Sequence, residues 1–462
     1  MPTPSGPFTG RTIAGLARDL RDGRTTSTAL VQLALDAIAE ADPLLNAFIT
    51  VDAAGARAAA RRADEELAGG VNRGPLHGVP VGVKDLIMVA GLPATMGSRH
   101  FAGHVAVADA ACVTRLRQAG AVVIGKTNTH EFAYGPTGDR SAAGPSRNPW
   151  EPARMSGGSS GGSAVAVAAG MVPLALGTDT GGSVRIPAAL CGVAGFKPAY
   201  GAIPVDGVFP LAQSFDTVGL LAGHEEDCLI AYRSLVPAGA PKDDGRPARV
   251  AWLDPTGLFA CDPQVARTVR RAVETGTGPL EEVAFPAKDV DELRETYIAI
   301  QSSEAAAVHA DRLAEAPELF DPELLERVRG AAEMPGWRYV RAMRARPRLT
   351  ESVGALFERH DVLALPTVPL TAPLLGQRTV EPDGEPVALG QRATELDGGS
   401  VAVRAALLAL TSMWNVVGFP ALSVPAGTVR GLPVGLQLVC RPGGEHLLFE
   451  TAGATHGGPP PG

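Results

Sequence analysis

Short apolar runs alternate with helix-like segments along the first half of the chain. The runs, each long enough for one strand, cover residues 79–83, 121–124 and 172–176. Apolar or small residues at helical spacing predict helices over residues 25–41, 52–68, 109–119 and 163–169. Strands that alternate with helices are typical of an α/β sheet, in which ligands bind beyond the strand ends.

The pattern changes from about His224 onwards. Further strands are predicted over residues 249–253, 361–367 and 433–439. Residues 288–360 are mostly helical and polar, and we interpret them as a cover over the sheet that shapes substrate choice. Residues 376–400 are predicted to form a surface loop, and the tail 456–462 is predicted to be disordered. Because there is no internal repeat or long linker, we expect one domain over residues 1–462.

Composition and charge argue against several classes of protein. The 462 residues carry 41 Lys and Arg against 49 Asp and Glu, which argues against nucleic acid as a direct partner. The five cysteines are scattered without a CxxC pair, so neither a disulfide framework nor a zinc site is predicted. The charge-free run 405–429 contains Asn415, Pro420 and Pro425, which favour a buried helix followed by a strand over a membrane span. Without a secretory signal, we expect a soluble, cytoplasmic protein.

Two clusters of Gly and Ser are the clearest chemical feature of the chain. The first covers residues 156–163 and the second residues 178–183, with an apolar run of small residues between them. Glycine lets backbone N–H groups turn and approach a ligand closely, because no Cβ obstructs a positive φ. A Ser in such a turn presents its hydroxyl beside free N–H donors, which is the arrangement that acyl transfer needs.

Two other patterns match known motifs but lack the required context. Residues 120–127 satisfy GxxxxGK[ST], but the interior Ala-Val-Val-Ile favours a strand over a phosphate-binding loop, which argues against an ATPase. Residues 157–161 satisfy GxSxG without a preceding strand, which argues against a Ser-His-Asp hydrolase. His100 and His104 are predicted to be loop residues rather than metal ligands, and His130 to make a structural hydrogen bond.

A serine nucleophile needs a base, and no histidine is convincingly placed to be one. Lys84 follows the apolar run 79–83, so burial can lower its pKa toward neutrality and make its amine a base. The alternative is that Lys84 forms an ion pair with Asp85 or another carboxylate. The residues alone leave both roles open.

Six segments spread over nearly the whole chain carry a more specific signal. They are GPLHGVPVGVKDLI (74–87), RLRQAGAVVIGKTNTHEFAYG (115–135), RNPW (147–150), GGSSGGSAVAVAAG (157–170), LALGTDTGGSVRIPAALCGVAGFKP (174–198) and GFPALSVPAG (418–427). In these segments, and in the separations between Lys84, Ser159 and Ser183, the chain resembles the amidase signature family of Ser-Ser-Lys amide hydrolases. The resemblance implies a large, twisted, mixed β-sheet covered by helices on both faces, with the signature core at about residues 70–225.

The resemblance also implies roles for individual residues. Ser183 would form the acyl-enzyme. Ser159, held by a cis peptide bond to the preceding glycine, would bridge Ser183 to the base, Lys84. The implied oxyanion hole consists of the backbone N–H groups of Thr180, Gly181, Gly182 and Ser183. Asp179 and Arg185 would brace this loop rather than take part in the chemistry, and neither a metal nor an organic cofactor is implied.

The implied reaction is hydrolysis of a small, apolar or aryl carboxylic amide to the acid and ammonia or an amine. A rival is the glutaminase subunit of the tRNA-dependent amidotransferase, where an Asp seven residues before the Asn matching Asn415 holds the substrate's α-amino group. This chain has Leu408 there, which favours a stand-alone amidase. Allophanate- or biuret-type and aryl-acylamide hydrolases remain alternatives, and loops such as 200–215 and 300–345 would set the specificity.

A homodimer is common in the family. A non-catalytic scaffold is disfavoured because all three catalytic residues are present.

Overall fold

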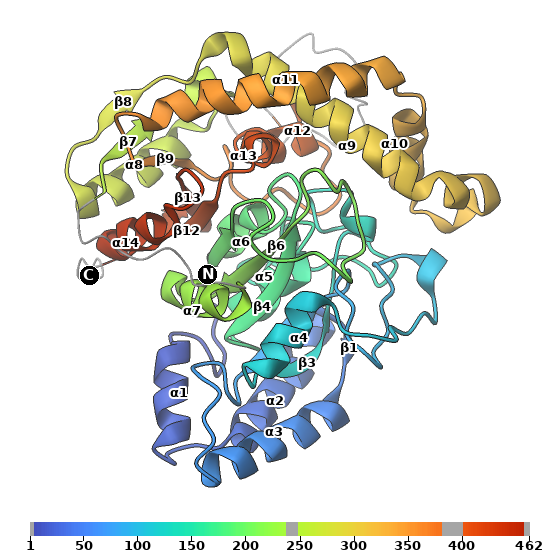
Figure 1. The fold of residues 1–462 in the computed structure, drawn as a ribbon, viewed down its shortest axis with the longest axis vertical. Helices are drawn as coiled ribbons and strands as arrows, with labels where there is room; N and C mark the ends of the chain where they lie inside the picture. Colours follow the sequence, from blue (N-terminus) through green and yellow to red (C-terminus); the bar gives the residue numbers. More distant parts are fainter. Residues whose placement is uncertain (1–3, 237–247, 381–400, 457–462) are drawn as a thin grey trace.

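The computed structural model describes residues 4–236, 248–380 and 401–456. Its strands are β1 (Phe48–Val51), β2 (Pro80–Lys84), β3 (Val122–Thr127), β4 (Leu174–Asp179), β5 (Ala194–Lys197), β6 (Thr217–Ala222), β7 (Val250–Leu253), β8 (Glu281–Val283), β9 (Val362–Pro366), β10 (Thr379–Val380), β11 (Val401–Ala402), β12 (Ala421–Val429) and β13 (Leu432–Val439). Eleven of them form one mixed sheet in the order β1-β3-β2-β4-β6-β5-β12-β13-β9-β7-β8, and β10 pairs with β11 (Figure 1). The predicted loop beyond residue 380 and the predicted tail from residue 457 lie outside the described residues.

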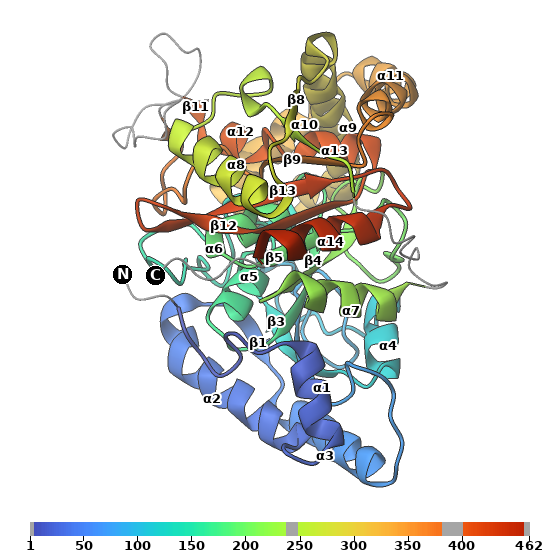
Figure 2. The same ribbon diagram turned by 90° about the vertical axis from the view of Figure 1, so that its left-hand side faces the viewer.

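Helices cover both faces of the large sheet (Figures 1 and 2). They are α1 (Ile13–Arg21), α2 (Ser27–Leu45), α3 (Ala53–Ala68), α4 (Ala111–Gln118), α5 (Gly161–Ala168), α6 (Arg185–Cys191), α7 (Glu225–Leu235), α8 (Pro263–Thr277), α9 (Ala287–Glu315), α10 (Pro322–Ala332), α11 (Gly336–Gly354), α12 (Val403–Leu408), α13 (Ser412–Val417) and α14 (Glu445–His456). The predicted cover is formed by α9, α10 and α11, called the cover helices below, at the top of Figure 1. The implied fold class is therefore confirmed.

Strands in the C-terminal half of the sheet separate two apolar cores. In β9, Val362 and Ala364 belong to one core, whereas Leu363 and Leu365 belong to the core beneath the cover helices. In β13, every second residue from Val434 to Leu438 belongs to the first core, and Val439 belongs to the core beneath the cover helices. A strand that is buried on both faces has a nearly continuous apolar sequence, which is why the sequence predicted both strands.

Some strands begin or end at residues other than those predicted from the sequence, and two strands were not predicted. β4 begins at Leu174 rather than at residue 172, because Pro173 has no N–H to donate to a neighbouring strand. β3 includes the apolar Val-Val-Ile of the phosphate-loop pattern, as predicted, and continues past the predicted end at residue 124 through Gly-Lys-Thr to Thr127. β5 and β6 were not predicted, since each is short and buried on both faces and therefore shows no alternation of apolar and polar residues.

The charge-free run near the C-terminus folds as predicted. Residues 405–429 form the end of α12, all of α13 and then β12, a helical stretch followed by a strand. Within the described ranges, no helix is both long and apolar enough to cross a membrane.

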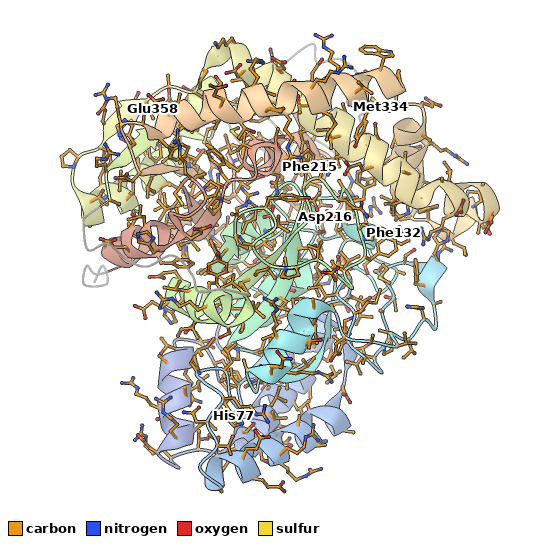
Figure 3. The ribbon with its side chains drawn as sticks, viewed as in Figure 1. His77, Phe132, Phe215, Asp216, Met334 and Glu358 are labelled. Atoms are coloured by element: carbon orange, nitrogen blue, oxygen red, sulfur yellow. The ribbon has the colours of Figure 1, made fainter. Side chains whose placement is uncertain are left out.

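The sheet brings the two Gly and Ser clusters to one edge. β2 and β4 are parallel neighbours, so their carboxyl ends, at Lys84 and Asp179, lie side by side. The first cluster leads into α5 and the second into α6. Phe215 and Asp216, which precede β6, lie between the sheet and the cover helices in Figure 3, whereas His77 lies at the opposite end of the molecule.

Gly125 in β3 is required by close packing of two strands. A Cβ at this position would overlap the carbonyl oxygen of Thr50 in β1. We expect Gly125→Ala to lower the free energy of unfolding by about 1–3 kcal/mol, because the added methyl group forces the strands apart. Gly69→Ala is a matched control, since its Cβ would lie 3.4 Å from the nearest atom, and there we expect a gain of about 0.4–1 kcal/mol. Urea denaturation of both variants checks this, and equal effects would contradict it.

Candidate active site

Lys84 is a fully buried amine surrounded by hydroxyl groups. Its Nζ lies 2.7 Å from Ser159 Oγ, 3.0 Å from Ser160 Oγ and 2.7 Å from Thr178 Oγ1. Burial holds the pKa of Lys84 well below its usual range, because removing the ammonium from water disfavours the charged form. The more distant charges of the aspartates near the site oppose this shift without cancelling it.

Lys84 does not pair with Asp85. Lys84 is the last residue of β2, and Asp85 lies in the turn that follows it. Asp85 instead lies 3.1 Å from Lys126 Nζ and accepts hydrogen bonds from the N–H and hydroxyl groups of Thr95. Among the described residues, no carboxylate lies within ion-pair distance of Lys84.

The Ser160 hydroxyl fixes the direction of one hydrogen bond to Lys84. It donates to the carbonyl of Thr178 at 3.1 Å and accepts from the N–H of Thr178 at 3.2 Å. Since the hydroxyl has a single proton, its contact with Lys84 must be one in which the amine donates. The sequence motifs do not single out Ser160 or Thr178 as part of the chemistry. The signal available was the position of Thr178 near the end of the strand beside β2.

Ser159 and Ser183 lie on adjacent segments. The Gly158–Ser159 peptide bond is cis. The carbonyl of Ser159 accepts from the N–H of His130 at 3.1 Å, and the N–H of Ser160 donates to the carbonyl of Ser183 at 3.0 Å. The backbone thus brings Ser183 next to the pair formed by Lys84 and Ser159. No hydrogen bond between the Ser159 and Ser183 hydroxyls is present in the described part of the chain.

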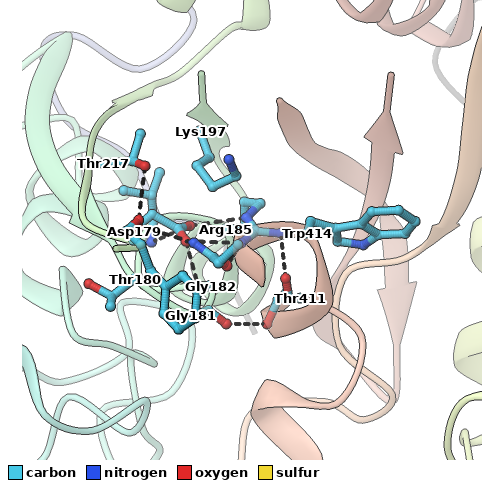
Figure 4. Close-up of polar contacts among 12 residues, drawn as sticks. Asp179, Thr180, Gly181, Gly182, Arg185, Lys197, Thr217, Thr411 and Trp414 are labelled. Atoms are coloured by element: carbon cyan, nitrogen blue, oxygen red, sulfur yellow. Dashed lines mark hydrogen bonds and ion pairs between the residues drawn. The ribbon is translucent and has the colours of Figure 1, made fainter. Parts of the chain in front are cut away.

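The loop after β4 is braced by one buried ion pair (Figure 4). Asp179 receives two hydrogen bonds from Arg185, from Nη2 at 2.9 Å and from Nε at 3.0 Å, and both side chains are inaccessible to solvent. Burial raises the pKa of the Asp179 carboxyl, but Arg185 outweighs burial and holds the pKa well below its usual range. The Arg185 guanidinium also donates to the carbonyl of Thr411, to Gln437 and to Asn415.

One of the predicted oxyanion donors is already occupied. The N–H of Gly182 donates to Asp179 at 2.8 Å, which fixes the loop but leaves this group unavailable to a ligand. The backbone N–H groups of Thr180, Gly181 and Ser183 have no acceptor within the described residues. Three of the four predicted donors therefore remain free in this structure.

Glycine is required at positions 181 and 182 because other elements press against the loop. A Cβ at Gly181 would overlap Tyr297 Oη of α9 and would lie 3.2 Å from Leu408 Cδ2 of α12. A Cβ at Gly182 would overlap the hydroxyl of Thr411, which itself donates to the carbonyl of Gly181 at 2.7 Å. The cover helices thus reach the site through Tyr297, whose ring stacks on Phe215 with centroids 5.6 Å apart.

Two of the histidines discussed in the sequence analysis, His100 and His130, lie among other side chains of the protein. His100 lies in a short 3-10 turn and packs edge-on against Phe320 at 4.3 Å. His130 is buried, and its ring lies 3.4 Å from the hydroxyl of Thr137. In the ranges that the structure describes, no group of three or more His, Cys, Asp or Glu is arranged to hold a metal ion.

The buried ion pair makes a testable prediction about stability. Arg185→Met leaves the Asp179 carboxylate buried without its partner, so we expect the free energy of unfolding to fall by about 3–5 kcal/mol. Arg24→Met is the control, because Arg24 pairs with Asp19 and Asp22 at an exposed site, where we expect little or no loss of stability. Thermal and urea unfolding measure both. The Asp179–Arg185 pair would not be the brace inferred here if the two variants lost equal stability.

Comparison with known proteins identifies relatives over almost the full length. The family model described as Amidase matches residues 29–449. The A subunit of glutamyl-tRNA(Gln) amidotransferase from Roseiflexus castenholzii is 35% identical, with 96% of this chain and 94% of the relative covered. The AtzE subunit of 1-carboxybiuret hydrolase from Pseudomonas sp. strain ADP is 35% identical, with 93% and 95% covered. A solved structure described as an amidase superposes with a TM-score of 0.87 at 36% identity, covering 96% of this chain and 98% of that one.

A match to the family model over most of the chain, relatives above 30% identity and the shared fold lead to one conclusion. The chain belongs to the amidase signature family of C–N amide hydrolases.

Proposed function

We propose that this protein hydrolyses a small carboxylic acid amide through an acyl-enzyme on Ser183, with Ser159 relaying protons to Lys84. The single observation that carries the proposal is the 2.7 Å contact between Lys84 Nζ and Ser159 Oγ in a site without a carboxylate partner for the amine among the described residues. Burial lowers the pKa of Lys84, which favours the uncharged amine that can accept a proton.

The hydrogen bonds around Lys84 suit an uncharged amine. Such an amine has two N–H donors and one lone pair. If the donors point to Ser160, whose proton is committed elsewhere, and to Thr178, the lone pair is left for the Ser159 hydroxyl. Ser159 can then give its proton to Lys84 while it accepts the proton of Ser183.

These proton transfers accompany each step of the proposed reaction, from attack on the amide to hydrolysis of the acyl-enzyme. Ser183 attacks the amide carbonyl, and the N–H groups of Thr180, Gly181 and Ser183 donate to the oxyanion. Each well-placed donor of this kind contributes about 2.7–4 kcal/mol of transition-state stabilisation. Ser159 returns a proton to the leaving nitrogen, which an amide needs because its anion is a very poor leaving group. Water hydrolyses the acyl-enzyme by the same relay.

The substrate class follows from the residue that faces the loop. Leu408, which occupies the position of the amino-binding Asp in glutaminase subunits, has its Cδ2 only 3.2 Å from the Cβ position of Gly181. An apolar side chain there cannot bind an α-amino group, which favours a stand-alone amidase. The alternatives are the glutaminase subunit of an amidotransferase, for which several relatives are named, and an allophanate- or biuret-type hydrolase, for which the AtzE relative is named. Ammonia release by the purified chain from simple amides supports the stand-alone amidase; release only from glutamine with partner subunits supports the glutaminase.

The nucleophile can be tested directly. Ser183→Ala should abolish amide turnover and covalent labelling by a fluorophosphonate probe, because the acyl-forming hydroxyl is gone. Mass spectrometry of the intact protein detects the adduct, and a thermal unfolding scan shows that the variant is folded. Labelling retained in Ser183→Ala would assign the nucleophile to another residue.

The pH profile tests the base. Because the pKa of Lys84 is lowered, kcat/KM should rise with pH through that pKa, as the amine loses its proton. Ser160→Ala removes a hydrogen-bond acceptor that stabilises the Lys84 ammonium, so the pKa of Lys84 should fall further. The acidic limb of the kcat/KM profile should therefore shift to lower pH, and kcat should fall about 10- to 100-fold.

Ser163→Ala is the matched control within the same cluster. Its hydroxyl is also buried, but it contacts Thr127 and the carbonyl of Leu176 rather than Lys84. We expect an unchanged acidic limb and a kcat within about threefold of the native value. If both alanine variants had the same pH profile, Ser160 would have no role at the amine.

A further inference from the structure

One face of α12 turns toward the Gly181 loop. Leu408 and Arg404 are four residues apart on this helix, so their side chains lie on the same face. Leu408 Cδ2 lies 3.2 Å from the Cβ position of Gly181. The face that carries Arg404 is therefore the face that borders the proposed oxyanion hole.

A chain of hydrogen bonds connects Arg404 to the same loop from the cover helices. Arg404 Nη2 donates to Gln301 Oε1 at 3.3 Å, and Gln301 Nε2 donates to Tyr297 Oη at 2.5 Å. Tyr297 Oη is the atom that a Cβ at Gly181 would overlap. Two independent routes, along α12 and through α9, thus bring the Arg404 guanidinium to the surroundings of Gly181.

Arg404 has an unmet hydrogen-bonding requirement. Within the described ranges its Nε is buried without an acceptor, and no carboxylate there pairs with Arg404. Arg378 also has a buried nitrogen without an acceptor, but Arg327 and Arg378 both pair with the Glu323 carboxylate, and Arg404 does not. A buried N–H of a charged group without an acceptor is costly, so this guanidinium is suited to bind an anion.

The electrostatic surroundings agree with this interpretation. Burial lowers the pKa of Arg327 to about 10, and the positive charge of Arg404 adds to the shift. The two guanidinium groups therefore lie close enough to repel each other. Arg140, Arg327 and Arg378 have carboxylate partners in Glu323, Asp139 and Asp321, whereas the charge of Arg404 is not paired with any carboxylate among the described residues.

We propose that Arg404 binds a carboxylate on the substrate, so that the preferred substrates are amides carrying a second, negatively charged group, such as monoamides of dicarboxylic acids. This inference rests on the proposed function. A guanidinium matches the planar geometry of a carboxylate and forms strong, charge-assisted hydrogen bonds with it. Leu408, one turn along the helix, supplies apolar contact for the methylene groups between the carboxylate and the amide.

The test compares charged substrates with neutral isosteres. Malonamate, succinamate and glutaramate are each paired with the amide in which an isopropyl group replaces the carboxylate. At least one monoamide should exceed its isostere in kcat/KM. Arg404→Gln should lower kcat/KM for that monoamide about 10- to 100-fold, mainly through KM, and change the isostere less than about threefold. Arg404→Lys should give an intermediate loss, because the charge remains without the planar fork.

Arg344→Gln is the control, because Arg344 is an exposed arginine on the cover helix α11. It should leave both substrates unaffected. A preference of the native protein for every neutral isostere, or an equal loss of both substrates in Arg404→Gln, would overturn the proposal.

A binding measurement separates this proposal from the proposed function. Calorimetry with malonate, succinate and glutarate should show binding of at least one dicarboxylate to the native protein and loss of that binding in Arg404→Gln. If no amide is hydrolysed but this binding pattern holds, the carboxylate site stands and the amidase proposal fails. If no dicarboxylate binds the native protein, or if Arg404→Gln binds it equally well, the carboxylate site is refuted.

Discussion

The burial of the Lys84 amine among hydroxyl groups is the constraint on which the site depends. An ammonium loses hydration when it is buried, and only a carboxylate close by could compensate for that loss fully. The structure provides hydroxyls from Ser159, Ser160 and Thr178 instead. The amine is thereby biased toward its uncharged form, which is the form that a proton acceptor requires.

The surrounding charges are arranged so that this bias persists. Two buried carboxylates near the site already have other cations as partners: Asp85 pairs with Lys126, and Asp179 pairs with Arg185. The second pair has an additional role, because Asp179 also accepts the N–H of Gly182 and so fixes the shape of the loop. The same ion pair thus keeps a negative charge engaged away from Lys84 and orients the remaining backbone donors.

The side chains that we propose to select the substrate come from other elements than the proposed reaction centre. The Gly and Ser clusters come from the sheet edge, whereas the side chains that press on the loop from outside come from α9 and α12. Relatives named for different substrates match this chain at similar identity. Under this proposal, one reaction centre can act on different amides, because Tyr297, Leu408 and Arg404 can change without altering the strands that hold Lys84 and Asp179.

The sequence by itself determined the α/β class, the strands that lead to the two clusters and the family, and it predicted Lys84, Ser159 and Ser183 as the catalytic residues. These features depend on local periodicity and on motifs, which neighbouring residues express directly. The tertiary structure decided that Asp85 turns away from Lys84, that Gly182 gives its N–H to Asp179, and that Arg404 has no carboxylate partner among the described residues. Those outcomes depend on contacts between segments far apart in the chain, and no local pattern records which distant group a buried charge will meet.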